Sequence, residues 1–220
     1  MITAAETAVL RQSMLEIGSA TLHEAQGQSG ALASAIKPLD PTRRLIGPAM
    51  TIDAKPGDNL VIHHALSFAQ SGDVLVVDAK GYAEAGPWGD ILTLAAQKLG
   101  IAGLIIDGAV RDSDAILKMG FPVFCRGLSI RAAQKNQPGR VNVPIICGGV
   151  AVNPGDWIMG DRDGVVVISK LNVAAVIAAA KRREAKEIVL RKGIEAGKST
   201  VEMLNLEDSL KRVGLSRSNQ

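Results

Sequence analysis

The residues best suited to chemistry in this sequence are Arg111 and Asp112, which follow an apolar run. The run, residues 104–106, has the length and β-branched content of a buried strand, and Asp107-Gly108 comes directly after it. On extended backbone, adjacent side chains point in different directions, so we expect two separate functional groups rather than one ion pair. Arg111 would hold an anionic oxygen, and Asp112 would hold a cation.

A plainer interpretation of the same residues is helix capping. Strand-to-helix junctions often carry Ser or Asp, and Ser113 or Asp114 could cap a helix that starts near Ala115, with Arg111 merely solvated. The local pattern is compatible with both interpretations, because a single Arg-Asp dipeptide is a weak motif.

A second candidate is Gly89-Asp90, which precedes a predicted helix over residues 91–99. The unpaired backbone N–H groups of a first helical turn attract anions, so this segment could receive a carboxylate. Gly89 could equally serve a tight turn and Asp90 a helix cap, and both roles can coexist with anion binding. His63 and His64 are consecutive, so they cannot both bind one metal from one helical face.

Composition excludes several classes of protein. The chain has 220 residues with 47% hydrophobic residues, enough for one sizeable core. Its formal net charge is +3, its aromatic content is 3%, and its one dense basic cluster is residues 181–183, so we expect no nucleic-acid binding. No apolar run reaches about 18 residues, so we also expect no membrane span.

The two cysteines, Cys125 and Cys147, lie next to strand-like runs, and their spacing fits neither a zinc site nor a redox motif. We therefore expect buried, reduced thiols. No signal peptide is recognisable, and we expect a cytoplasmic protein.

The order of predicted elements indicates an α/β fold. Strands and helices alternate from residue 45 to residue 125, which favours parallel pairing with ligands beyond the carboxyl ends of the strands. From residue 127 on, short strands divided by turn residues indicate an antiparallel β section. We predict one domain, with a core and N-terminal helices over residues 1–170. A C-terminal helical extension over residues 171–220 would make a subunit contact.

Several motifs resemble one enzyme family, and the similarity runs from about Ile17 to Ile168. Asp90, twenty intervening residues and then Arg111-Asp112 match the pattern of the class II 4-hydroxy-4-methyl-2-oxoglutarate/4-carboxy-4-hydroxy-2-oxoadipate aldolases. This superfamily includes the regulator of ribonuclease E activity A. The other motifs that carry the resemblance are Pro56-Gly57-Asp58-Asn59, Gly72-Asp73, Trp88-Gly89 and Ile106-Asp107-Gly108.

The resemblance implies a three-layer β/β/α swivelling-domain fold that assembles as a homotrimer or homohexamer. It implies Mg²⁺ or Mn²⁺ bound through Asp112 and substrate contacts from Arg111. It also implies that the segment Gly89, Asp90, Ile91 and Leu92 receives a substrate carboxylate. In the family, an acidic residue from a neighbouring subunit's C-terminal helix approaches the metal, and Glu184 or Glu187 could supply it.

The implied reaction is retro-aldol cleavage of a 4-hydroxy-2-oxo dicarboxylic acid to pyruvate and an oxo acid, with oxaloacetate decarboxylation as a side activity. Arg111 would stabilise the enolate, and a water oriented by Asp90 would act as base. No lysine is an obvious Schiff-base nucleophile, which favours a metal. The family's acidic residue after the metal ligand is replaced by Ala115. The alternative is therefore a non-catalytic protein-binding regulator, for example a ribonuclease inhibitor.

Overall fold

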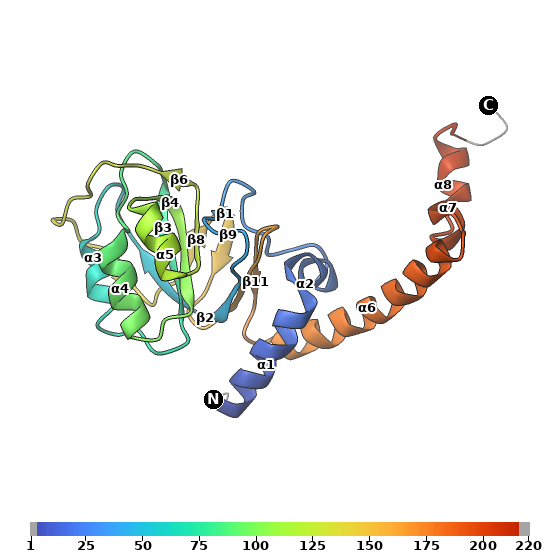
Figure 1. Ribbon diagram of the computed structural model, residues 1–220, viewed down its shortest axis with the longest axis horizontal. Coiled ribbons are helices and arrows are strands. Elements are labelled where there is room, and N and C mark those ends of the chain that lie inside the picture. The colour runs from blue at the N-terminus through green and yellow to red at the C-terminus, as the bar shows by residue number, and fades with distance from the viewer. Residues whose placement is uncertain (1–3, 216–220) are drawn as a thin grey trace. The chain divides into compact units, whose positions relative to one another are not determined.

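The computed structural model describes residues 4–215 (Figure 1). Its helices are α1 Ala4–Ile17, α2 Ser19–Ala25, α3 Leu60–Ala65, α4 Asp90–Lys98, α5 Ser113–Met119, α6 Val173–Glu195, α7 Thr200–Met203 and α8 Glu207–Arg212. Its strands are β1 Lys37–Pro38, β2 Leu45–Asp53, β3 Val74–Tyr82, β4 Gly103–Val110, β5 Val123–Cys125, β6 Gly127–Leu128, β7 Arg140–Val141, β8 Ile145–Cys147, β9 Val150–Val152, β10 Trp157–Gly160 and β11 Val165–Ile168.

The main sheet has nine strands, and its longest path runs β1-β5-β4-β3-β2-β10-β11. The four central strands β2, β3, β4 and β5 pair in parallel, and β10 and β11 extend the sheet in antiparallel fashion. Strands β8 and β9 form a separate antiparallel hairpin. The predicted change from a parallel α/β part to an antiparallel part is therefore confirmed.

Alternation along the central strands produces two hydrophobic cores, one on each face of the sheet. Leu75, Val77 and Leu104 pack into one core, and Val76 and Ile105 pack into the other. This is the period of two expected when successive side chains point to opposite faces. The first core includes residues of α3, α4 and α5, while the second includes residues of β8, β9, β10 and β11 (Figure 1). The α/β fold class with β, β and α layers is confirmed.

A third core joins the N-terminal helices to the antiparallel part of the sheet. Met14, Leu22, Met159 and Val176 are among its buried members. Helix α2 begins at Ser19 after Gly18 and has no side-chain cap from its N-cap residue. The carboxylate of Asp161 instead accepts hydrogen bonds from the backbone N–H (2.8 Å) and hydroxyl (2.6 Å) of Ser19.

The chain divides into two compact units, Met1–Ala180 and Lys181–Gln220. The second unit contains the last part of α6 and the short helices α7 and α8. Ser199 caps α7, because its side chain accepts a hydrogen bond from the amide of Glu202. In residues 4–215 no helix is long and apolar enough to cross a membrane.

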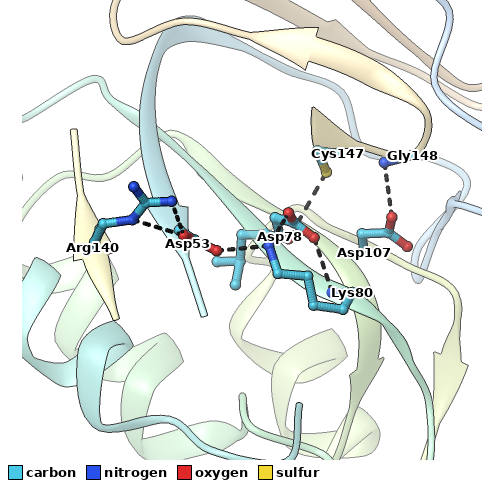
Figure 2. A network of polar contacts seen from close by, with 8 residues as sticks. Asp53, Asp78, Lys80, Asp107, Arg140, Cys147 and Gly148 are labelled. Carbon is cyan, nitrogen blue, oxygen red and sulfur yellow. Dashed lines mark hydrogen bonds and ion pairs between the residues drawn. The ribbon is translucent and has the colours of Figure 1, made fainter. Parts of the chain in front are cut away.

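Charged residues gather where β2 and β3 end, on the hairpin side of the sheet (Figure 2). The ammonium group of Lys80 lies 2.6 Å from Asp53 and 2.5 Å from Asp78, and the guanidinium of Arg140 lies 2.7 Å from Asp53. The acidic and basic side chains of this cluster therefore form ion pairs with one another. They stabilise this part of the sheet rather than offer an unpaired charge to a ligand.

Strand β4 also anchors the turn of the β8–β9 hairpin. The carboxylate of the buried residue Asp107 accepts a hydrogen bond of 2.8 Å from the amide of Gly148 (Figure 2). It also forms an ion pair with Arg126. Three residues beyond Asp107, β4 ends and the candidate site begins.

Candidate functional site

Arg111 and Asp112 follow the end of β4, as predicted, but they do not point apart. The Nε atom of Arg111 lies 3.3 Å from Oδ2 of Asp112. Extended backbone ends at Val110, and Asp112 adopts the left-handed conformation, with φ 55° and ψ 37°. This left-handed residue turns the chain between strand and helix, which brings the two side chains together. The expectation of two separately directed groups was therefore wrong.

The Asp112 carboxylate is turned away from the helix it precedes. Asp112 is the N-cap residue of α5, yet its side chain makes no capping hydrogen bond there. Its Oδ2 atom instead lies 3.4 Å from the amide nitrogen of Asp90, at the start of α4. Helix α5 begins at Ser113, so the interpretation in which Ser113 or Asp114 caps a helix starting near Ala115 is also wrong.

Gly89 makes this approach possible. A Cβ atom at Gly89 would lie 2.3 Å from Oδ2 of Asp112 and 3.2 Å from Nε of Arg111, so any side chain there would collide with the charged pair. The φ of Gly89 is −150°, an extended conformation open to any residue, so glycine is required for space rather than for backbone freedom. Glycine at this position therefore leaves the space that the carboxylate of Asp112 occupies.

The loop that carries Gly89 is held rigidly against β4. The amide of Arg111 donates a hydrogen bond of 2.9 Å to the carbonyl of Trp88. The indole of Trp88 is fully buried and donates to the hydroxyl of Thr93, and that hydroxyl donates to the carbonyl of Gly89. Buried polar groups that satisfy one another in this way specify a single geometry.

The first turn of α4 faces the charged pair. Asp90 is half-buried, and its Oδ1 atom accepts a hydrogen bond of 2.8 Å from the amide of Ile91. Ile91 is exposed and Leu92 is buried. The N-cap residue of α4 is Gly89, so Asp90 is the first helical residue rather than the cap.

A cavity of about 180 Å³ lies in front of this arrangement. It brings together five of the residues that the sequence predicted, namely Gly89, Asp90, Ile91, Leu92 and Arg111. The sequence did not single out three further lining residues, Asn59, Ala133 and Lys135. His63, which the sequence offered only as a weak candidate, also lines the cavity. Gly86 and Pro87 complete the lining.

Asn59 and His63 occupy one side of the cavity. The side-chain amide of Asn59 donates a hydrogen bond of 2.8 Å to the carbonyl of Pro87, while its Oδ1 atom is buried without a partner in the described residues. Burial, assisted by the positive charge of Lys135, lowers the pKa of His63. The turn Pro56-Gly57-Asp58-Asn59 was the signal that could have directed attention to Asn59.

The residues present fit a hard divalent cation bound by few protein ligands. No group of three or more metal-ligating side chains occurs within the described part of the chain, residues 4–215. Mg²⁺ usually keeps several waters and binds through one or two carboxylates, so the single carboxylate of Asp112 suits it. Asp112 is about two-fifths exposed (38%), which leaves its carboxylate accessible.

Glu184 and Glu187 lie on α6 beyond Ala180, in the second unit. Glu187 forms ion pairs with Arg183 at 3.3 Å and Arg191 at 3.1 Å. Their approach to the site of a neighbouring subunit stays a prediction.

Comparison with known proteins identifies the family of this chain. The family model described as RraA-like, Aldolase/RraA, matches residues 16–167. A Halalkalibacterium halodurans protein with the provisional name 4-hydroxy-4-methyl-2-oxoglutarate aldolase is 46% identical over 156 residues, 71% of this chain and 74% of that protein.

Two solved structures share the fold. An uncharacterised protein from Pseudomonas syringae has a TM-score of 0.78 at 28% identity, covering 89% of this chain and 96% of its own. Streptomyces coelicolor RraAS2, described as an unusual member of the RNase ES inhibitor RraA family, has a TM-score of 0.74 at 31% identity, covering 83% of this chain and 96% of its own. The chain therefore belongs to the RraA-like Aldolase/RraA family.

Proposed function

We propose that this protein is a divalent-metal-dependent aldolase. It cleaves a 4-hydroxy-2-oxo dicarboxylic acid, of the 4-hydroxy-4-methyl-2-oxoglutarate or 4-carboxy-4-hydroxy-2-oxoadipate type, to pyruvate and a second oxo acid. Oxaloacetate decarboxylation, which also passes through the pyruvate enolate, is the expected side activity. Family membership supports a lyase, and the substrate class is the one in the name of the Halalkalibacterium halodurans relative.

The observation that carries the proposal is the position of a charged pair beside one cavity. Arg111 and the first turn of α4 line the cavity. Asp112 is not among the lining residues, but its carboxylate lies 3.3 Å from Arg111 and 3.4 Å from the amide nitrogen of Asp90. Together they supply a cation, a carboxylate and backbone N–H groups. An oxo acid needs each of these, because its carboxylate seeks N–H donors and its 2-oxo group must be polarised.

Each residue of the site then has a separate role in the reaction. The amides at the start of α4 receive the C1 carboxylate of the substrate, which replaces the present contacts of the Asp90 and Ile91 amides with the carboxylates of Asp112 and Asp90. A water molecule held by the free carboxylate oxygen of Asp90 removes the proton of the C4 hydroxyl. The C3–C4 bond breaks, its electron pair forms the enolate of pyruvate, and Arg111 stabilises the charge on the enolate oxygen. Protonation at C3 completes pyruvate, and C4 leaves as the carbonyl of the second oxo acid.

Asp112 would hold the metal, with waters and substrate oxygens as the remaining ligands. Mg²⁺ or Mn²⁺ bound there supplies Lewis-acid polarisation of the 2-oxo group. Either Glu184 or Glu187 of a neighbouring subunit in a homotrimer or homohexamer adds an acidic group near the metal.

The expectation that no lysine is available for a Schiff base needs correction, because Lys135 lines the cavity. Lys135 is exposed, whereas a lysine nucleophile is usually activated by desolvation in an apolar pocket or by another cation. We therefore assign Lys135 to substrate binding. Treatment with borohydride in the presence of pyruvate tests this assignment. A lysine Schiff base would be trapped as a covalent adduct, and we expect none.

The decisive experiment follows pyruvate formation through coupled lactate dehydrogenase. The protein is incubated with 4-hydroxy-4-methyl-2-oxoglutarate or with oxaloacetate, in the presence of Mg²⁺ or of EDTA. We expect pyruvate only with the metal, and none from Asp112→Ala. Asp114→Ala removes an exposed carboxylate of α5 two residues away and serves as the matched control, with activity retained. Absence of turnover of both substrates by the native protein would refute the proposal.

A second candidate function is that of a protein-binding regulator. It is favoured by Ala115, which stands in the first turn of α5 where the resemblance calls for an acidic residue. A regulator of this kind would bind a ribonuclease with an affinity that neither EDTA nor Arg111→Ala changes.

A further inference from the structure

One wall of the cavity is an extended segment, residues 131–137, which we call the strap. It pairs by single β-bridges with two other loops, through Ala132 with Gly86 and through Gln134 with Asp58. The intervening residues Ala133 and Lys135 line the cavity. The strap therefore alternates between residues that attach it and residues that face the cavity.

The strap has little packing of its own. Ala133 is half-buried and the other residues from 131 to 137 are exposed. Its position must therefore come from hydrogen bonds. On one side of Lys135, the carbonyl of Gln134 accepts a bond of 2.9 Å from Asn59, and its amide donates one of 2.8 Å to Gly57.

On the other side of Lys135, the strap is held by a buried carboxylate. Asp58 is 2% exposed, and its Oδ2 atom accepts hydrogen bonds from the amides of Asn136 (2.8 Å) and Gln137 (3.1 Å). Its Oδ1 atom accepts a bond of 2.9 Å from the amide of Leu60, at the start of α3. One side chain thus joins the strap to the helix that carries His63.

The charge state of Asp58 suits this role. Burial alone would raise its pKa, but the three backbone hydrogen bonds, from Asn136, Leu60 and Gln137, and the nearby charge of Lys135 outweigh it and lower the pKa. An ionised carboxylate is the stronger acceptor. In the part of the chain that the structure describes, Lys135 has no ion-pair partner, so its ammonium group is available to a ligand.

We propose that Asp58 is a positioning residue for substrate selection. By holding the amides of Asn136 and Gln137, it keeps Lys135 at the cavity, where the ammonium group receives the second carboxylate of a dicarboxylic substrate. The inference rests on the proposed function for the identity of the substrate, but the hydrogen bonds that carry it are independent of the chemistry at Arg111.

The test compares two variants, Asp58→Asn and Lys135→Ala, with 4-hydroxy-4-methyl-2-oxoglutarate as substrate. Each should raise KM about 10-fold, the order expected for one charge-assisted contact, with a much smaller change in kcat. The double variant should resemble Lys135→Ala alone, because both changes remove the same contact. If the KM of the double variant were instead raised by the product of the two single-variant effects, the inference would be overturned.

Asp156→Asn provides a matched control for simple destabilisation. Asp156 is also buried, at 3% exposure, and it accepts hydrogen bonds from the amides of Asn153 and Lys170, none of which lines the cavity. It should lower the midpoint of thermal unfolding without changing KM. Identical behaviour of Asp58→Asn and Asp156→Asn in both measurements would leave Asp58 with a structural role only and would overturn the inference.

If Asp58→Asn does not fold, Gln137→Pro takes its place, because it removes one of the hydrogen-bond donors from the strap itself. This variant should raise KM in the same way, and an unchanged KM would overturn the inference.

A native protein that turns over no oxo acid would refute the proposed function but not this inference, which is then tested by calorimetry with Mg²⁺ present. 2-Oxoglutarate should bind more tightly than 2-oxobutyrate, which lacks the second carboxylate, and Asp58→Asn should abolish the difference. Equal binding of the two acids by the native protein would overturn the inference.

Discussion

The guanidinium Nε of Arg111 lies 3.3 Å from Oδ2 of Asp112, although the two residues are neighbours in the chain. The contact exists because Asp112 is left-handed, so the backbone reverses between the end of β4 and the start of α5. A cation this close stabilises the carboxylate and also opposes the approach of a metal ion. Each of the two side chains therefore affects the function of the other. Single substitutions can distinguish the effect of Arg111 on the reaction rate from its effect on metal binding at Asp112.

We predict that Arg111→Ala lowers kcat by roughly 10² to 10³, the usual loss when one oxyanion-stabilising group is removed. Metal affinity should be retained or increased, because a positive charge beside Asp112 has gone. Titration with Mn²⁺, alongside pyruvate formation, measures both quantities. Loss of Mn²⁺ binding in this variant would contradict the division of roles, and Arg111→Lys should recover only part of the rate because lysine lacks the planar fork.

Gly89→Ala should abolish metal-dependent activity. The added methyl group would lie 2.3 Å from Oδ2 of Asp112, so the carboxylate or the loop must move. Gly164→Ala is the control, because a Cβ there meets no atom within 4 Å. We expect the control to keep the native kcat and Mn²⁺ affinity. Full activity in Gly89→Ala would show that the close contact between the loop at Gly89 and the carboxylate of Asp112 is not needed for activity.

Stability should rise with pH where His63 titrates. Burial and the charge of Lys135 lower the pKa of His63, so between that pKa and the ordinary value near 6.5 the unfolded chain binds more protons than the folded one. The free energy of unfolding therefore increases with pH through this window, and the His63 contribution levels off above about 6.5.

Urea unfolding between about pH 5 and pH 7 measures this slope, and His63→Gln should remove it. Lys135→Met should raise the pKa of His63, as followed by its NMR titration. A slope unchanged in His63→Gln would assign the pH dependence to another group.

Both thiols should be inert in the folded protein. Burial raises the pKa of the Cys125 thiol to about 11, and burial together with the nearby carboxylate of Asp107 raises the pKa of Cys147 further. The reactive species is the thiolate, so a thiol reagent at about pH 8 should label neither residue until denaturant is added. Rapid labelling of the native protein would show that one of these residues becomes exposed. The expectation of buried, free cysteines is confirmed.

The central elements of the fold could be predicted because their signals are local. Apolar runs such as residues 74–77 and 104–106 are buried on both faces, and their type was evident from composition alone. Element ends were harder. The helix expected over residues 91–99 runs instead from Asp90 to Lys98, and strand β3 continues beyond its apolar run to Tyr82 through a register shift.

The site was only partly predictable, for a physical reason. Arg111, Asp90 and Gly89 stand at element ends, where sequence motifs direct attention. The left-handed backbone of Asp112 is set by tertiary contacts, and the residue type alone does not predict it. Lys135 was missed because the strap is positioned by hydrogen bonds to Asp58, which is 77 residues away in the chain from Lys135 and leaves no periodic pattern.

The close fit between the loop and the end of β4 has an evolutionary consequence. A Cβ at Gly89 would collide with the side chains of Asp112 and Arg111, whereas a Cβ at Gly86 would lie 2.7 Å from the backbone carbonyl of Ser129 and 3.0 Å from the backbone nitrogen of Arg111. Gly89 and the charged pair thus form one steric unit, while Gly86 is constrained by backbone atoms that remain whatever residue stands at position 111. Among relatives, we expect positions 89, 111 and 112 to change together, so that a homologue that has lost the charged pair is released from glycine at position 89 but keeps glycine at position 86.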